Sequence, residues 1–136
     1  MTRINVIPPS ELTDQHLMAE YRELPMVMGS LRRSLKSKKG LPTPKDEYTL
    51  NGGHVTFFYD KGRYLYKRYQ LLIQELLERG YKLDPERKAD FAVFIENKLY
   101  NDWTPNEKAA IINRERISER IAQKPNWYRY KGVKVA

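Results

Sequence analysis

The sequence predicts an all-α fold: a single compact domain of residues 1–136, with three main helices, ordered irregular connections and a C-terminal tail. Apolar side chains recur every three or four residues in three long stretches, as they do on the buried face of a helix. Only one short run is typical of a β-strand, and a single strand has no partner with which to form a sheet. A chain of 136 residues can bury one core without disulfides or metals.

The first helix is expected over residues 14–38. Thr13 or Asp14 can cap its first turn, and Gly40 ends it. Pro25 lies well inside this stretch and lacks the amide hydrogen that would bond to the carbonyl one turn earlier, so we expect a kink there. The predicted buried stripe comprises Leu17, Tyr21, Leu24, Met28, Leu31 and Leu35.

The second and third helices have recognisable ends. The second is expected over residues 61–79, with Asp60 as its N-cap and Gly80 as its stop. The third begins at the capping box Thr104-Pro105-Asn106-Glu107, with proline at the first helical position, and ends at Pro125. At helical spacing this third helix carries Ile111, Arg114, Ile117 and Ile121.

The remaining segments are expected to connect the helices. Residues 40–53 are rich in proline and glycine, and residues 85–99 are expected to contain a short extra helix. The run HVTFFY at residues 54–59 is expected to be extended and to lie as a strap across the helices. The last ten residues, from Trp127 onward, are aromatic and basic without a helical period, so we expect an irregular tail.

The composition excludes several classes of protein. The chain has no cysteine, which excludes disulfides, iron–sulfur clusters and thiolate zinc sites, and its two histidines have no metal-binding spacing. We therefore expect no metal and no cofactor. The first residues contain no signal peptide, and no stretch approaches the roughly 18 apolar residues of a membrane span. The expected protein is soluble and cytoplasmic, with no membrane partner.

The charge of the chain favours a polyanionic partner. The formal net charge is +8, from 25 basic and 17 acidic residues, although a charge of this sign can also serve solubility. Ten tyrosines add surfaces on which nucleic-acid bases can stack. Two stretches of basic residues contain no acid: Arg32, Arg33, Lys36, Lys38 and Lys39 at the end of the first helix and just after it, and Lys124, Arg129, Lys131 and Lys134 in the tail.

One face of the first helix carries four polar side chains of different chemistry. Gln15 and Arg22 lie close to one line along the helix, and His16 and Glu23 lie on the neighbouring line. An amide, a guanidinium, an imidazole and a carboxylate are thus presented together. This arrangement is also typical of an ordinary solvated helix face.

Thr2 is a second candidate for chemistry. A chain beginning Met-Thr is expected to lose Met1, which frees the α-amine of Thr2. The pKa of such an amine is about 7.7–8.0, against about 10.4 for lysine, so a useful fraction is neutral at pH 7 and able to attack a sugar carbon. Every protein has an N-terminus, however, and few use it as a nucleophile.

Four segments carry a resemblance to a known family. MTRIN, SELTDQHLMAEYREL, GHVTFFYDK and IAQKPNWYRY occur in order across nearly the whole chain. Together they resemble the pyrimidine-dimer DNA glycosylase/AP lyases of T-even bacteriophage, the endonuclease V family. Residues 27–50 and 81–106 resemble that family only weakly.

The resemblance implies a repair enzyme acting on damaged double-stranded DNA, with cyclobutane pyrimidine dimers as substrate. In that family the α-amine that corresponds to Thr2 attacks C1′ of the damaged nucleotide, expels the base and forms a Schiff base. β-Elimination then cleaves the strand at the abasic site. The carboxylate that corresponds to Glu23 stabilises the positive sugar and assists proton transfer. Members act as monomers without a metal or cofactor.

The resemblance also implies a set of DNA-binding residues. Arg3 and Arg22 match positions that bind phosphates around the lesion, and Gln15 and His16 match the adjoining polar face. The other matching positions are Arg116 and Arg120 in the third helix and the aromatic Trp127, Tyr128 and Tyr130 of the tail. These aromatic residues are implicated in lesion recognition, although such a tail can also simply pack on the core.

Two residues depart from the family pattern. Met26 stands where the family has an arginine near the lesion phosphates, and Tyr69 stands where it has a glutamine lining a pocket for a flipped base. Tyr69 can stack with such a base or join the buried stripe of its helix. These departures leave two alternatives open: the same lyase chemistry on another modified or oxidised base, and a non-catalytic DNA-binding protein of this fold.

Overall fold

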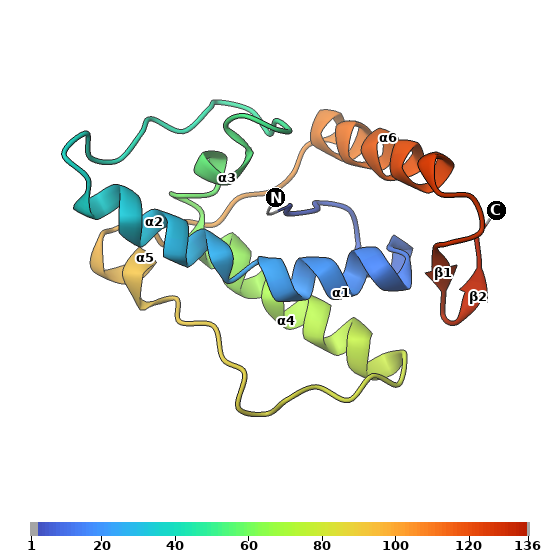
Figure 1. The fold of residues 1–136 in the computed structure, drawn as a ribbon. Coiled ribbons are helices and arrows are strands. Elements are labelled where there is room, and N and C mark those ends of the chain that lie inside the picture. Colours follow the sequence, from blue (N-terminus) through green and yellow to red (C-terminus); the bar gives the residue numbers. More distant parts are fainter. Residues whose placement is uncertain (1–2, 136) are drawn as a thin grey trace.

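The computed structural model describes residues 3–135 and confirms the predicted all-α class (Figure 1). The only strands in this part of the chain form one two-stranded antiparallel hairpin. After a 3-10 turn (Pro9–Glu11) the elements are α1 (Asp14–Glu23), α2 (Met26–Lys36), α3 (His54–Phe57), α4 (Gly62–Glu78), α5 (Ala92–Glu96), α6 (Glu107–Gln123), β1 (Arg129–Tyr130) and β2 (Val133–Lys134).

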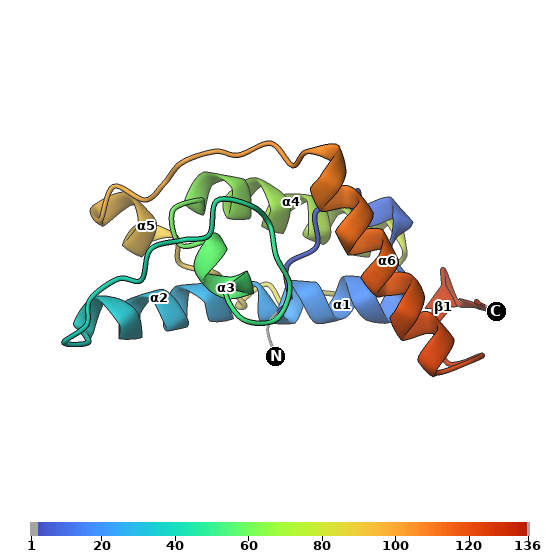
Figure 2. The same cartoon turned by 90° about the horizontal axis from the view of Figure 1, so that it is seen from above.

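The helices enclose the N-terminal segment of the chain. Helices α1 and α2 follow one another nearly in line, and α4 packs against α1 (Figures 1 and 2). Helix α6 lies on the other side of the N-terminal segment from α1 (Figure 1). In the described residues, no helix is both long and apolar enough to cross a membrane.

The predicted kink divides the first helix at Pro25 into α1 and α2. Beyond this proline, the amides of Val27 and Met28 bond to carbonyls three residues earlier, at 3.1 and 3.2 Å, so one tight turn joins the two helices. Thr13 is the N-cap of α1, as predicted. The predicted end at residue 38 is too late, because Ser37 already has extended backbone.

The extended strap predicted at residues 54–59 is wrong, since the segment begins with the helical turn α3. Gly53, with φ +87°, turns the chain, and the Thr56 hydroxyl donates to its carbonyl at 3.1 Å. Phe57 and Phe58 are both fully buried. Neighbouring side chains of a strand point to opposite faces, so burial of both in one core overrides the β-propensity of the run.

The predicted caps of the later helices need correction. Asp60 does not cap α4, whose N-cap is Lys61; the Asp60 carboxylate instead accepts from the Lys61 ammonium at 2.8 Å. Helix α6 begins two residues later than predicted, because the Asn106 side chain accepts the Ala109 amide at 2.8 Å and is the stronger cap. The predicted stop at Gly80 is confirmed by its left-handed φ of +91°.

Two further segments differ from expectation. The extra helix predicted within residues 85–99 is limited to α5. The tail is not irregular: it folds back as the β1–β2 hairpin. Its two central residues, Lys131 and Gly132, both have positive φ (49° and 85°), as a type I′ turn requires.

A close approach between α4 and α5 makes Gly62 sensitive to substitution. An added Cβ would lie 2.4 Å from Phe94 atoms, whereas the nearest atom to a Cβ at Gly29 in α2 would be 3.7 Å away. Gly62→Ala is therefore expected to destabilise the protein by about 1–3 kcal/mol through overpacking. Gly29→Ala, the matched control, is expected to stabilise it by roughly 0.5–1 kcal/mol because alanine favours helix. Urea unfolding of both variants checks this pair; equal midpoints would contradict it.

Candidate active site

An open cleft of about 340 Å³ lies between α1, α6 and the N-terminal segment. Its walls come from five parts of the chain: the N-terminal segment, α1, the loop before α3, α6 and the tail. The residues that line it are Arg3, Asn5, His16, Ala19, Glu20, Glu23, Asn51, Arg116, Arg120 and Tyr128. Six of the predicted site residues therefore meet in one place: Arg3, His16, Glu23, Arg116, Arg120 and Tyr128.

The chain enters the cleft through the buried segment of residues 3–7, which has no strand beside it. Its backbone groups must then be satisfied by side chains. The Ile4 amide donates to His54 Nε2 at 2.8 Å, and the amides of Val6 and Ile7 donate to Asn113 Oδ1 at 2.7 and 3.2 Å. The Tyr48 hydroxyl donates to the Ile4 carbonyl at 3.0 Å, and Arg68 donates to that of Ile7.

His54 holds the entering segment as a neutral imidazole. Its Nδ1 lies 2.7 Å from the Thr49 carbonyl, which fixes the proton on Nδ1 and leaves Nε2 to accept from Ile4. Burial lowers the pKa of His54 most; the positive Arg3 adds to this, and the Thr49 carbonyl opposes it. Neither His54 nor Asn113 was a predicted site residue.

The Glu23 carboxylate accepts a hydrogen bond from the backbone of Arg3, the first residue that the structure describes. The Arg3 amide donates to Glu23 Oε1 at 3.1 Å, and the Glu23 side chain is half-buried at the cleft wall. The other predicted catalytic residue, Thr2, lies outside the described residues. What the structure shows is a carboxylate hydrogen-bonded to the peptide nitrogen that follows Thr2.

Three arginines give the cleft its charge. Burial lowers the pKa of the Arg3 guanidinium, and the positive charges of Arg116 and Arg120 lower it further. Among the described residues, Arg3 and Arg120 form no ion pair. Arg116 reaches Asn51 Oδ1 at 3.3 Å and Glu119 at 3.8 Å, and its buried Nε has no partner within residues 3–135. Crowded, incompletely paired guanidinium groups favour an anion such as a phosphate.

An aromatic pair closes the end of the cleft nearest the tail. The His16 ring stacks on Tyr128 with 4.5 Å between centroids and 11° between planes. His16 Nδ1 also contacts the Thr13 hydroxyl at 2.7 Å. Burial, followed by the charges of Arg3 and Arg120, lowers the pKa of His16 to about 4. The imidazole is thus neutral at pH 7.

Comparison with known families decides the class of protein. Residues 1–89 match the family model described as pyrimidine dimer DNA glycosylase. The chain belongs to the pyrimidine dimer DNA glycosylase family. The resemblance predicted from the four sequence segments is confirmed over the matched residues, and membership makes the chain a DNA-repair glycosylase with DNA as its substrate.

The match contains the N-terminal segment and helices α1 to α4 of the glycosylase, including Arg3 and Glu23. Helix α6 and the hairpin lie beyond residue 89. Arg116, Arg120 and Tyr128 are therefore placed at the site by the fold, which brings them to the cleft that the matched segment forms. Within residues 3–135 the glycosylase has no cluster of three acidic or histidine side chains that could hold a metal ion.

The other predicted DNA contacts of the glycosylase lie outside the cleft. Arg22 is exposed on α1. The Gln15 side chain binds the tail: its Nε2 donates to the Trp127 carbonyl at 2.8 Å, and its Oε1 accepts the Arg129 amide at 2.9 Å. Trp127 is 50% exposed, whereas the Tyr130 hydroxyl donates to the Ser10 carbonyl at 2.7 Å. Their contacts with DNA stay predictions.

Of the two roles left open for Tyr69, the structure favours the core. Its side chain is 4% exposed and stacks on Tyr21, with 5.5 Å between the ring centroids. Its ring also packs against that of Phe91, with 6.1 Å between centroids. It does not line the cleft. Met26 is 56% exposed on α2, in the wall of a groove that Arg33 also lines.

Proposed function

We propose that this glycosylase is bifunctional, cleaving the glycosidic bond of cyclobutane pyrimidine dimers in duplex DNA and then the strand at the abasic site. The nucleophile is the α-amine of Thr2 after removal of Met1. The observation that supports this most directly is the 3.1 Å hydrogen bond from the Arg3 amide to Glu23. Within one residue, covalent geometry keeps the α-amine within about 4 Å of that amide nitrogen, so it is tethered close to the carboxylate.

The chemistry follows from an amine beside a carboxylate. The neutral amine attacks C1′, and the base leaves with the electron pair of the glycosidic bond. Loss of an amine proton and opening of the sugar ring give an iminium, which makes the C2′ proton acidic. Removal of that proton breaks the C3′–O bond by β-elimination. Glu23 stabilises the positive sugar and transfers protons in these steps.

The cations of the cleft hold the DNA backbone around the reacting sugar. Arg3, Arg116 and Arg120 bind phosphates at the cleft, and Arg22 binds a phosphate farther along α1. His16 and Tyr128 contact the damaged nucleotide, with Gln15, Trp127 and Tyr130 in supporting contacts. We expect the protein to act as a monomer, as the resemblance to the family implies.

Reductive trapping tests the proposal. Wild-type protein whose intact mass shows loss of Met1 is mixed with duplex containing an abasic site and reduced with borohydride. A covalent adduct is expected, and mass spectrometry should locate it on the N-terminal residue. Protein whose N-terminal amine is acetylated is the matched control and should form none. An adduct on a lysine, or equal trapping by acetylated protein, would exclude Thr2 as the nucleophile.

Another lesion class remains as the second candidate. Met26 supports it, because a thioether replaces an arginine near the expected phosphates, whereas the burial of Tyr69 removes the other reason for it. Side-by-side cleavage of duplexes containing a dimer and an oxidised base separates the candidates. Faster cleavage of the oxidised base would favour the second.

A further inference from the structure

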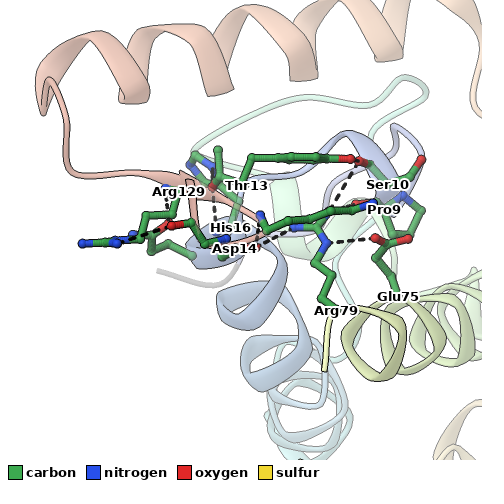
Figure 3. A network of polar contacts seen from close by, with 12 residues as sticks. Pro9, Ser10, Thr13, Asp14, His16, Glu75, Arg79 and Arg129 are labelled. Carbon is green, nitrogen blue, oxygen red and sulfur yellow. Dashed lines mark hydrogen bonds and ion pairs between the residues drawn. The ribbon is translucent and has the colours of Figure 1, made fainter. Parts of the chain in front are cut away.

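The C-terminal hairpin is too short to be stable alone, because each of its strands has only two residues. Its turn also contains a lysine with positive φ, at Lys131, where an asparagine or glycine is usual. The hairpin must therefore be held by contacts with the rest of the protein. Gln15 binds the chain on either side of Tyr128, and the neighbouring Asp14, at the start of α1, binds the turn of the hairpin (Figure 3).

Asp14 binds the turn with both carboxylate oxygens. Oδ1 accepts the Lys131 amide at 3.0 Å, and Oδ2 accepts the Gly132 amide at 2.9 Å. Burial by itself would raise the pKa of Asp14, but hydrogen bonds from Gly132, Arg79 and Lys131 hold it below its usual range. The carboxylate is thus ionised at neutral pH and fixes the turn.

Arg79, at the far end of α4, fixes Asp14 in turn. Its Nη1 donates to Asp14 Oδ1 at 3.0 Å, and its Nε donates to Glu75 at 2.8 Å (Figure 3). The guanidinium also lies over the Tyr130 ring, 4.7 Å from the centroid. The Arg79 side chain is only 1% exposed, so these interactions are little screened by water.

The opposite end of the hairpin reaches the active-site cleft. Tyr128, the residue before β1, is 8% exposed, lines the cleft and stacks on His16. Its carbonyl accepts the Val135 amide at 2.9 Å, which ties it to the returning strand. A continuous set of contacts therefore leads from Arg79, which does not line the cleft, to an aromatic wall that does.

We propose that Arg79 is a positioning residue that, through Asp14 and the hairpin, holds Tyr128 against His16 and so sets recognition of the damaged base. The recognition step rests on the proposed function. Arg79 also donates to the Pro9 and Ser10 carbonyls at 3.2 and 3.4 Å. The amides of residues 4, 6 and 7 are held by His54 and Asn113 instead, so Arg79 has no part in bond cleavage. Loss of Arg79 should weaken binding of the lesion and leave the chemistry at the sugar intact.

The first test follows His16 itself by NMR. The chain has two histidines, so a titration gives two curves, with His54 as the internal reference. In wild-type protein His16 should titrate near pH 4. In Arg79→Gln the loosened Tyr128 should leave the imidazole in water, and its pKa should rise by at least about one unit toward 6.5. His54 should not change.

The second test separates binding from chemistry. Arg79→Gln is expected to raise KM for dimer-containing duplex roughly tenfold, the scale of one lost aromatic stacking contact, with kcat little changed. Borohydride trapping on an abasic site should keep its wild-type rate. Lys67→Gln is the matched control, because its exposed pair with Asp102 lies toward the other end of α4 from Arg79, and it should match wild type in every assay.

The outcomes are distinguishable. If Arg79→Gln is too unstable to assay, Asp14→Asn tests the same contacts more mildly. An unchanged His16 titration, or equal losses on dimer and abasic DNA, would overturn the positioning role. If wild-type protein forms no adduct on any DNA, the proposed function is wrong, while the His16 titration still decides whether Arg79 positions Tyr128.

Discussion

Replacing Glu23 with glutamine is expected to lower the rate of dimer cleavage by a factor of about 10² to 10⁴, the usual contribution of a group that transfers protons at the reacting bond. Binding of DNA should change little, because glutamine removes a negative charge rather than a phosphate ligand. The position of the N-terminal segment should also be kept, because it depends on the hydrogen bond from the Arg3 amide to Glu23 Oε1 at 3.1 Å. A glutamine oxygen can accept the same hydrogen bond.

The Glu23→Gln substitution therefore distinguishes the effect of the Glu23 charge from the effect of the hydrogen bond that positions the N-terminal segment. Glu23→Gln keeps the N-terminal segment in place and removes only the carboxylate, whereas Glu23→Ala removes both. Single-turnover cleavage and borohydride trapping measure the chemical steps, and Glu78→Gln, an exposed glutamate on α4, is the control. If Glu23→Gln cleaves dimers within threefold of wild type, the carboxylate does not take part in the reaction.

The parts of the fold that the sequence predicts well depend on local physics. The helical period, the break at Pro25, the Thr13 cap and the stop at Gly80 each follow from a few neighbouring residues. The errors occur where distant contacts decide. The run at residues 54–59 has strand propensity, yet two adjacent phenylalanines enter one core and the chain turns helical instead.

Helix α6 is a second example in which distant contacts, rather than the local pattern, decide which residues are buried. Of the residues that the sequence places at helical spacing, Ile111 and Arg114 are exposed and Ile117 is buried, and Ala109 and Asn113 also face inward. Asn113 is fully buried because it binds the amides of residues more than 100 positions earlier in the chain. An asparagine in a helix gives no sign of such a partner, so the apolar period identifies Ile117 and Ile121 but not Asn113.

The sequence predicted which residues take part in the candidate site, but not how they are arranged in space. The resemblance picks out Glu23 and the basic residues, and the fold then brings six of the predicted residues to one cleft. Asn51 was missed, although it lines the cleft and binds Arg116 at 3.3 Å. Its positive φ of 59° in a glycine-rich loop is the one available signal, since asparagine tolerates that conformation.

The largest effect on stability is expected at the buried ion pair between α1 and α4. The Glu20 carboxylate accepts from Arg68 Nε at 2.8 Å and Nη2 at 2.9 Å, and the two side chains are 0% and 4% exposed. Glu20→Ala leaves the guanidinium buried without its partner, which typically costs about 3–5 kcal/mol. Glu11→Ala, which breaks the exposed pair with Arg114, should cost no more than about 1 kcal/mol.

A double variant distinguishes the stability of this pair from its role in the site. Glu20→Leu combined with Arg68→Met replaces both charges with apolar groups, and should recover much of the lost free energy of unfolding in urea. Activity should not recover. Glu20 also accepts from Asn5 Nδ2 at 2.9 Å, and Arg68 donates to the Ile7 carbonyl, so both anchors of the N-terminal segment are lost. If the double variant is stable and traps abasic DNA at the wild-type rate, the pair holds the helices together without positioning the chain that leads to Glu23.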